Sequence, residues 1–173
     1  MLKSFLNAVT HGLNMEKPTE TIMVGVDGSK HAEAAFQVAT DMAKLHGARL
    51  LIVAIHTSPA MPLTPGVPGY PQILTSFPEY SPKVPKEVTD NMEPTLKEYE
   101  ERAKKAGVKS VESKIVAVWN TVGGGLVTEA EREGVSLIVV GSRGLTGLKR
   151  TLLGSVADYV VKNAHRNVLV VRR

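Results

Sequence analysis

The sequence predicts an α/β protein built on a single doubly wound, five-stranded parallel sheet with helices on both faces. Strand-like and helix-like segments alternate along the chain, which is the arrangement that parallel sheets require. The strand-like segments are short and almost continuously apolar, as expected of parallel strands that helices cover on both sides. In such sheets ligands bind at the carboxyl ends of the strands, beside the point where the strand order reverses.

The first two strands and the helix between them open this alternation. Residues 21–26 (TIMVGV) are apolar and predict a buried strand. Lys30–His46 places apolar side chains on one helical stripe, and Gly47 ends the helix. The second strand is predicted over residues 49–55 (RLLIVAI), which completes the first strand–helix–strand unit.

A proline-rich stretch then interrupts the pattern. Residues 57–90 hold eight of the chain's ten prolines and are interpreted as an insertion into the domain, most simply a surface loop. Residues 1–19 have the apolar spacing of a short helix but lack the continuous apolar core of a secretion signal, so they are interpreted as an N-terminal extension. One domain is therefore expected over residues 20–173.

The second half of the chain resumes the alternation. A helix with its apolar face between Met92 and Ala106 ends at Gly107, and Pro94 lies near its start or kinks it. The remaining elements are predicted as strands at 111–119, 135–140 and 167–171 and as helices at 126–133 and 155–164. The glycines at 123–125 either loosen a loop over the site or begin the helix that follows, and the second interpretation is favoured.

Composition and charge narrow the classes of function. The chain is 43% hydrophobic and 22% charged, as globular proteins are, and no apolar run approaches the roughly 20 residues that a membrane-spanning helix needs. The sequence contains no cysteine, which excludes disulfides and thiolate metal sites and fits a cytoplasmic location. The net charge is +4, but the basic residues are spread along the chain, so no nucleic-acid partner is expected.

The segment that carries chemistry runs from Gly141, at the end of a predicted strand, to Ser155, at the start of a predicted helix. Its spacing is glycine, two residues, Gly144, nine residues, Gly154 and serine. Glycines let backbone N–H groups approach a ligand that a side chain would block, and Arg143 adds positive charge. The spacing differs from both the Walker loop and the dinucleotide fingerprint, and it predicts a phosphate site.

The start of the last helix supports this prediction. Ser155 can cap the helix, and Asp158 three residues later resembles the second member of a capping box. An anion beside Ser155 and Val156 would gain from the helix dipole and from free N–H groups. The alternative is that the glycines only punctuate a strand-to-helix connection, as they do in many α/β domains.

These segments together resemble the universal stress proteins, in particular the members that bind ATP, whose signature is Gly-x2-Gly-x9-Gly-Ser/Thr. VGVDGSKHAEAAFQVA resembles the family's first strand and helix, and LLIVAIHTSP resembles its second strand. SLIVVGSRG and GSVADYVVKNAHRNVLVV resemble its closing third. The resemblance covers residues 20–173 and implies a Rossmann-like fold of the adenine nucleotide alpha hydrolase-like type.

The resemblance also implies roles for single residues. Asp27 and the backbone of Ile55, beside Gly25, are expected to hold the adenine. The residues expected at the ribose are Val140 and Gly141, and those expected at the phosphates are Gly144, Gly154, Ser155 and Val156, often with Mg or Mn on the phosphate oxygens. A carboxylate can accept a hydrogen bond from the adenine amino group, and an apolar side chain suits a flat base. For Asp27, turn formation in Asp-Gly-Ser is nearly as good an explanation.

The implied function is a stress-response sensor or regulator that binds ATP, ADP or AMP, with slow ATP hydrolysis at most. The alternatives are a phosphoryl- or adenylyl-transfer enzyme and a scaffold that binds no nucleotide. The histidines are scattered, and Glu129, Glu131 and Glu133 are interpreted as a solvated face rather than an acid–base pair. The resemblance further implies a homodimer through the 167–171 strand, whose free edge could pair with a copy of itself.

Overall fold

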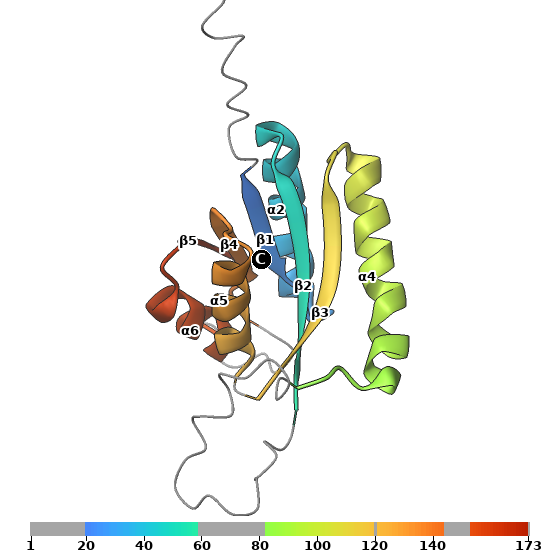
Figure 1. The fold of residues 1–173 in the computed structure, drawn as a ribbon. Coiled ribbons are helices and arrows are strands. Elements are labelled where there is room, and N and C mark those ends of the chain that lie inside the picture. The colour runs from blue at the N-terminus through green and yellow to red at the C-terminus, as the bar shows by residue number, and fades with distance from the viewer. Residues whose placement is uncertain (1–19, 59–81, 120, 144–152, 173) are drawn as a thin grey trace, which may run out of the picture.

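Five strands and four helices alternate along the part of the chain that the computed structural model describes, residues 20–58, 82–119, 121–143 and 153–172 (Figure 1). In chain order the elements are β1 (Thr21–Gly25), α2 (Lys30–His46), β2 (Arg49–Thr57), α4 (Lys86–Ala106), β3 (Val111–Val118), α5 (Val122–Arg132), β4 (Leu137–Gly141), α6 (Ser155–Asn163) and β5 (Asn167–Val171). The predicted fold class is therefore confirmed.

The strands form one parallel sheet in the order β3-β2-β1-β4-β5. The chain moves outward from β1 through β2 to β3, and then returns to the other side of β1 with β4 and ends at β5. The strand order thus reverses between β1 and β4. A parallel α/β sheet opens a crevice at its carboxyl edge at this point, because successive connections leave toward opposite sides.

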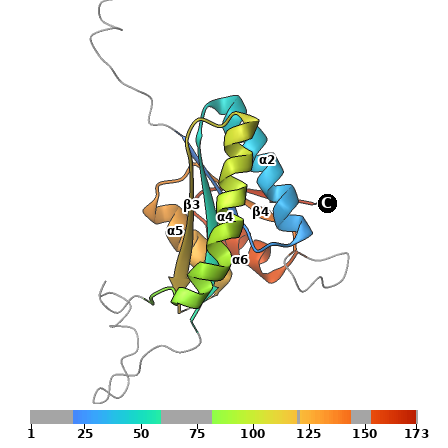
Figure 2. The same cartoon turned by 90° about the vertical axis from the view of Figure 1, so that its right-hand side faces the viewer.

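Two helices cover each face of the sheet. Helices α2 and α4 pack on one face and α5 and α6 on the other, which Figure 2 shows for α5 against α2 and α4. The side chains of β1 and β2 alternate between the two cores. Ile22 and Leu50 belong to the core beneath α2 and α4, whereas Met23 and Leu51 belong to the core beneath α5 and α6. Burial on both faces explains why these strands lack polar alternation.

Helix α4 is fixed to α2 by an aromatic and ionic cluster. The rings of Phe36 and Tyr99 lie 4.6 Å apart, and the guanidinium of Arg102 lies over both, 5.0 and 5.3 Å from their centres. The same guanidinium pairs with the carboxylate of Glu33 on α2. Helix α4 begins at Lys86, so its first turn falls within the 57–90 range that the prolines marked as an insertion.

Helix α5 begins earlier than the sequence pattern predicted. It starts at Val122 rather than residue 126, so the three glycines form its first turns. A β-carbon on Gly123 would lie 2.8 Å from Cβ of Tyr159 on α6, and one on Gly125 would lie 2.9 Å from Cγ1 of Val118 on β3. The glycines weaken the helix by about 1 kcal/mol each relative to alanine, but they let α5 pack closely against both neighbours.

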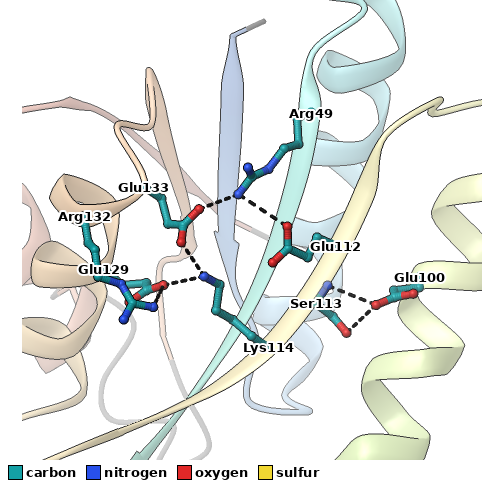
Figure 3. A network of polar contacts seen from close by, with 8 residues as sticks. All are labelled: Arg49, Glu100, Glu112, Ser113, Lys114, Glu129, Arg132 and Glu133. Carbon is teal, nitrogen blue, oxygen red and sulfur yellow. Dashed lines mark hydrogen bonds and ion pairs between the residues drawn. The ribbon is translucent and has the colours of Figure 1, made fainter. Parts of the chain in front are cut away.

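The other end of α5 is held by a network of ion pairs, of which one member is buried (Figure 3). Nζ of Lys114 on β3 lies 2.7 Å from Glu129 and 2.6 Å from Glu133. Nη2 of Arg49, at the start of β2, lies 2.5 Å from Glu133, and Nη2 of Arg132 lies 2.8 Å from Glu129. The side chain of Glu129 is only 3% exposed, so its charge depends on these cations for compensation.

The prediction that this acidic run forms a solvated face is wrong for two of its three residues. Glu131 is exposed, as predicted, but Glu129 and Glu133 face the sheet. Hydrogen bonds from Lys114 and then Arg49 lower the pKa of Glu133 to about 2. Burial alone would lower the pKa of Lys114, but its bonds to the two carboxylates outweigh that effect and raise it.

Acid should remove the stabilisation that Glu133 provides. Its pKa falls from an ordinary 4.5 to about 2 on folding, so the contribution is complete above about pH 4.5 and is lost as the pH falls toward 2. At pH 7, Glu133→Gln should lower the free energy of unfolding by about 1 kcal/mol, measured by urea denaturation. The gap between this variant and the parent should close between about pH 4.5 and pH 2.

The matched control is Glu131→Gln, which neutralises an exposed neighbour on the same helix. Its effect should stay within about 0.5 kcal/mol at every pH. A gap between Glu133→Gln and the parent that is unchanged down to about pH 2 would contradict the assignment of the acid sensitivity to Glu133.

Candidate functional site

A cavity of about 410 Å³ lies at the carboxyl edge of the sheet, where the strand order reverses. Nine of the ten residues predicted for the site line it. They are Gly25, Asp27, Ile55, Val140, Gly141, Arg143, Gly154, Ser155 and Val156. The tenth, Gly144, lies outside the described residues. The structure thus gathers the ends of three strands and the start of the last helix around one space.

Other residues of the cavity wall were not predicted as site residues. They are Val26, Ala32, Val53, Met92, Val122, Leu126 and Ala157. Met92 and Leu126 appeared in the sequence only as members of apolar helix faces. Helical spacing marks which residues face inward, but it does not tell whether they meet the core or a hollow beside it. The residues with a local sequence signal for this site lie in the turn at Asp27, at the strand ends and at the start of the last helix.

Asp27 shapes the turn that follows β1 and also faces the cavity. Its Oδ1 accepts a hydrogen bond from the backbone N–H of Ser29 at 2.9 Å. Ser29 in turn caps α2, because its hydroxyl oxygen accepts from the N–H of Ala32 at 3.1 Å. The turn engages one oxygen of the Asp27 carboxylate. Asp27 is also a residue of the cavity wall. The structure thus confirms the role of Asp27 in the turn, and its contact with adenine stays a prediction.

Helix α6 begins at the opposite end of the cavity, and its start differs from the prediction. The N-cap is Gly154, with extended backbone angles, and no side chain accepts a hydrogen bond there. Ser155 is already the first helical residue, so its hydroxyl does not cap the helix. Asp158 pairs with Lys162 at 2.8 Å instead of completing a capping box. The predicted capping box is wrong because the helix starts one residue earlier than a serine cap requires, which makes Ser155 the first helical residue.

The missing cap leaves donors that face the site. The first N–H to bond within α6 is that of Asp158, which donates to the carbonyl of Gly154 at 2.9 Å. The N–H groups of Ser155, Val156 and Ala157 come before it, where a helix has no internal acceptors. All three residues line the cavity. Helices α2 and α5, by contrast, are capped by Ser29 and Thr121.

Arg143 brings positive charge to the same end of the cavity. It lies just after β4 and lines the wall beside the start of α6. Its Nε is buried and has no hydrogen-bond partner among the described residues. A buried donor without a partner costs about 1–3 kcal/mol. An anion at this end would therefore meet a helix start and a guanidinium with unused hydrogen-bonding capacity.

Gly141 sets how closely β4 approaches α2. A β-carbon at this position would lie 2.7 Å from both the carbonyl carbon and the oxygen of His31, which are backbone atoms. At Gly25 the same added carbon would lie 3.0 Å from Cδ1 of Leu126, the far end of a side chain. Both glycines line the cavity, but only Gly141 faces rigid backbone.

Two further properties bear on the kind of site. Within residues 20–58, 82–119, 121–143 and 153–172, no three His, Asp or Glu side chains are grouped to hold a metal ion. Among the helices of these same ranges, none has both the length and the apolar character needed to cross a bilayer.

Comparisons with known proteins agree in family and in fold. Residues 18–172 match the model of the universal stress protein family. The chain is 33% identical over 152 residues to universal stress protein YxiE of Bacillus subtilis, covering 87% of this chain and 97% of that protein. The solved structure of UspA from Lactobacillus plantarum matches with a TM-score of 0.68 at 23% identity, over 88% of this chain and 97% of that one.

A second solved structure that matches this chain is that of a nucleotide complex. It is a universal stress protein in complex with cAMP, 27% identical to this chain. The match has a TM-score of 0.61 and covers 89% of this chain and 97% of that one.

Alanine at Gly141 should destabilise the fold more than alanine at Gly25. Gly141→Ala forces a β-carbon against the backbone of α2, and overpacking of this kind costs about 1–3 kcal/mol. Gly25→Ala should cost clearly less, because the end of the Leu126 side chain can move aside. Urea denaturation of both variants measures the difference. Equal losses would show that the contact between β4 and α2 is not as tight as these distances indicate.

Proposed function

The chain belongs to the universal stress protein family, and we propose that it binds an adenine nucleotide in the cavity at the carboxyl edge of its sheet. The observation that carries the proposal is the uncapped start of α6, where three N–H groups and Arg143 border a cavity that has an apolar far end. A nucleotide has this same division between an anionic tail and a flat, weakly polar base. Helix N-termini bind phosphate through the dipole and free amides together.

The size of the cavity supports a ligand of this class. At about 410 Å³ it falls within the range of about 300–1,000 Å³ that is usual for small-molecule sites. The end away from α6 is bordered by Val53 and Ile55 of β2 and by Leu126 of α5, all apolar. A purine ring packed between such side chains would place its two faces against apolar atoms.

Asp27 gives this apolar end a preference for adenine. A carboxylate only accepts hydrogen bonds, and the exocyclic amino group of adenine donates them. Guanine carries an oxygen at the same place on the ring, so it would set two acceptors against each other. Because the turn uses Oδ1 of Asp27, the second oxygen is the one assigned to the base.

At the other end we assign the phosphates to the N–H groups of Ser155 and Val156, with Arg143 alongside. Gly154 lines the cavity at this end, and Val140 and Gly141 are assigned to the ribose between the two ends. The complex of a related protein with cAMP supports an adenine ligand. ATP or ADP would place further phosphates toward Gly144, with Mg or Mn held by the phosphate oxygens.

The proposed role is that of a sensor or regulator rather than a dedicated enzyme, and we place it in the cytoplasm, as the cysteine-free sequence led us to expect. Asp27 is the one carboxylate among the described residues of the cavity wall, and its turn already engages it. Fast phosphoryl transfer needs a base or water-positioning group near the phosphate. Asp27 is assigned to the opposite end, so any hydrolysis of ATP should be slow.

Calorimetric titration with AMP, ADP, ATP and GMP, with and without magnesium, tests the proposal. Asp27→Asn should weaken AMP binding by about tenfold or more, since an unpaired polar contact costs about 1–3 kcal/mol. The amide oxygen can still accept from Ser29, which preserves the turn, but the amide nitrogen then meets the adenine amino group donor to donor. Guanine accepts at this place, so the preference for AMP over GMP should fall.

Asp41→Asn is the matched control, because Asp41 is exposed on α2 and lies outside the cavity wall. It should leave every affinity unchanged. An Asp27→Asn protein with the affinities of the parent would contradict the role of Asp27, whereas a parent that binds none of the adenine nucleotides would contradict the proposed function itself.

We also propose a homodimer through β5, which is an edge strand of the sheet. The carbonyl of Val171 accepts a hydrogen bond at 2.8 Å from the backbone N–H of Ser142, which follows β4. The backbone groups of Val171 therefore face β4. Alternate residues of a strand direct these groups to opposite sides, and those of Val168 and Val170 therefore face away from the sheet.

Proline at position 170 should separate the dimer without unfolding the subunit. Val170→Pro removes an N–H that faces outward, which an edge strand tolerates. Size-exclusion chromatography with light scattering should show a dimer for the parent and a monomer for the variant, with native circular dichroism. Val170→Thr keeps the N–H and should stay dimeric. A monomeric parent, or a dimeric proline variant, would count against pairing through β5.

A further inference from the structure

A second, smaller hollow opens beside the proposed base end of the cavity. It measures about 170 Å³ and shares three wall residues with the main cavity, Val26, Asp27 and Met92. We call it the side chamber. Its remaining walls include Ala54 of β2 and three residues of α4, Asn91, Thr95 and Tyr99. The side chamber therefore lies between the strand ends and α4, on the side of the sheet opposite α5.

The size of the side chamber suits a chemical group rather than a whole ligand. Its 170 Å³ is below the lower limit of about 300 Å³ for small-molecule sites. It is nevertheless far larger than the roughly 10–15 Å³ that a single water needs on this measure. A substituent of a few carbon atoms on a ligand held in the main cavity would fit both limits.

The chemistry of the walls suits an aliphatic group. The deep part is apolar, since Ala54 and Leu96 are 1% and 4% exposed. The polar side chains of Asn91 and Thr95 are exposed at the α4 side, where a group could keep contact with water. An alkyl chain placed here would leave solvent without burying an unpaired polar group.

The chamber is also held in shape before any ligand arrives. Tyr99 is 5% exposed and packs its ring against Phe36, and Arg102 covers both rings while pairing with α2. These contacts fix the α4 turn next to the chamber. A preformed space costs less to occupy than one that a ligand must open.

We infer that the side chamber receives a substituent on the exocyclic amino nitrogen of the bound adenine, so that the ligands of this protein include N6-alkylated adenine nucleotides. The inference rests on the proposed function, in which this nitrogen faces Asp27. Asp27 is a wall of both spaces, so the amino group lies at the passage between them. An amine with one alkyl group keeps one N–H for the carboxylate and directs the alkyl group away from it.

Calorimetric titration of the full chain with four nucleotides tests the inference. N6-butyl-AMP should bind within about threefold of AMP, because the chamber accepts the chain that water would otherwise surround. The isomer 8-butyl-AMP carries the same chain on another edge of the base and should bind at least about tenfold more weakly. N6,N6-dimethyl-AMP has no N–H for Asp27 and should also lose about tenfold or more.

A substitution that fills the chamber separates it from the main cavity. Thr95 lines only the side chamber and is exposed on α4, so Thr95→Phe should leave the fold and AMP binding intact. It should weaken N6-butyl-AMP by about tenfold or more, whereas Thr95→Val, of nearly unchanged volume, should have no effect. Asn91→Phe narrows the chamber from the preceding turn and should repeat the result.

The outcomes distinguish failure of this inference from failure of the proposed adenine-nucleotide binding. If AMP binds but N6-butyl-AMP is at least about tenfold weaker in the parent, the side chamber does not receive the substituent and the inference fails alone. It also fails if Thr95→Phe weakens both nucleotides equally or neither. If AMP itself does not bind, the proposed function fails and the inference falls with it.

Discussion

The reversal of strand order beside β1 is the constraint on which the rest of this structure depends. Because β2 and β4 flank β1 and run parallel to it, each connection must cross back over the sheet, and the two directions of travel place helices on opposite faces. Every helix then starts near the carboxyl edge. The ends of β1 and β4 and the starts of α5 and α6 therefore meet around one cavity. The site is a consequence of the winding of the chain.

Glycines allow the helices and strands around the cavity to pack closely against one another. Gly141 brings β4 against the backbone of α2, and Gly123 and Gly125 bring α5 against α6 and β3. Helix α5 thereby lines the cavity with Val122 and Leu126 while its last turn is tied to the sheet through Lys114. Close packing at one end and ion pairing at the other hold a short helix in place, and with it the wall of the cavity.

The sequence was informative wherever the physics is local. The apolar strands and the glycine at the end of α2 each follow from neighbouring residues, and their predictions agree with the structure. The spacing of Gly141–Ser155 is also a local signal, but its predicted role at a phosphate stays a prediction. Properties that depend on tertiary neighbours were not predictable. That residues 123–125 begin α5 was the favoured interpretation of the sequence, but their close packing against Tyr159 and Val118 was not predictable. Glu129 was interpreted as a surface charge because its partner Lys114 belongs to another element. The contribution of Met92 to the cavity likewise depends on how α4 docks.

The uncapped start of α6 has a consequence for the stability of the folded state. A helix with glycine at its N-cap forgoes only a few tenths of a kcal/mol relative to a serine or threonine cap, but its first N–H groups keep no side-chain acceptor. An anion that occupies this position restores the lost interactions only while the chain is folded, so its concentration enters the folding equilibrium directly. If the proposed nucleotide binds there, the thermal stability of the protein and its resistance to proteolysis should rise with the nucleotide concentration. The lifetime of such a protein would then depend on the concentration of its ligand.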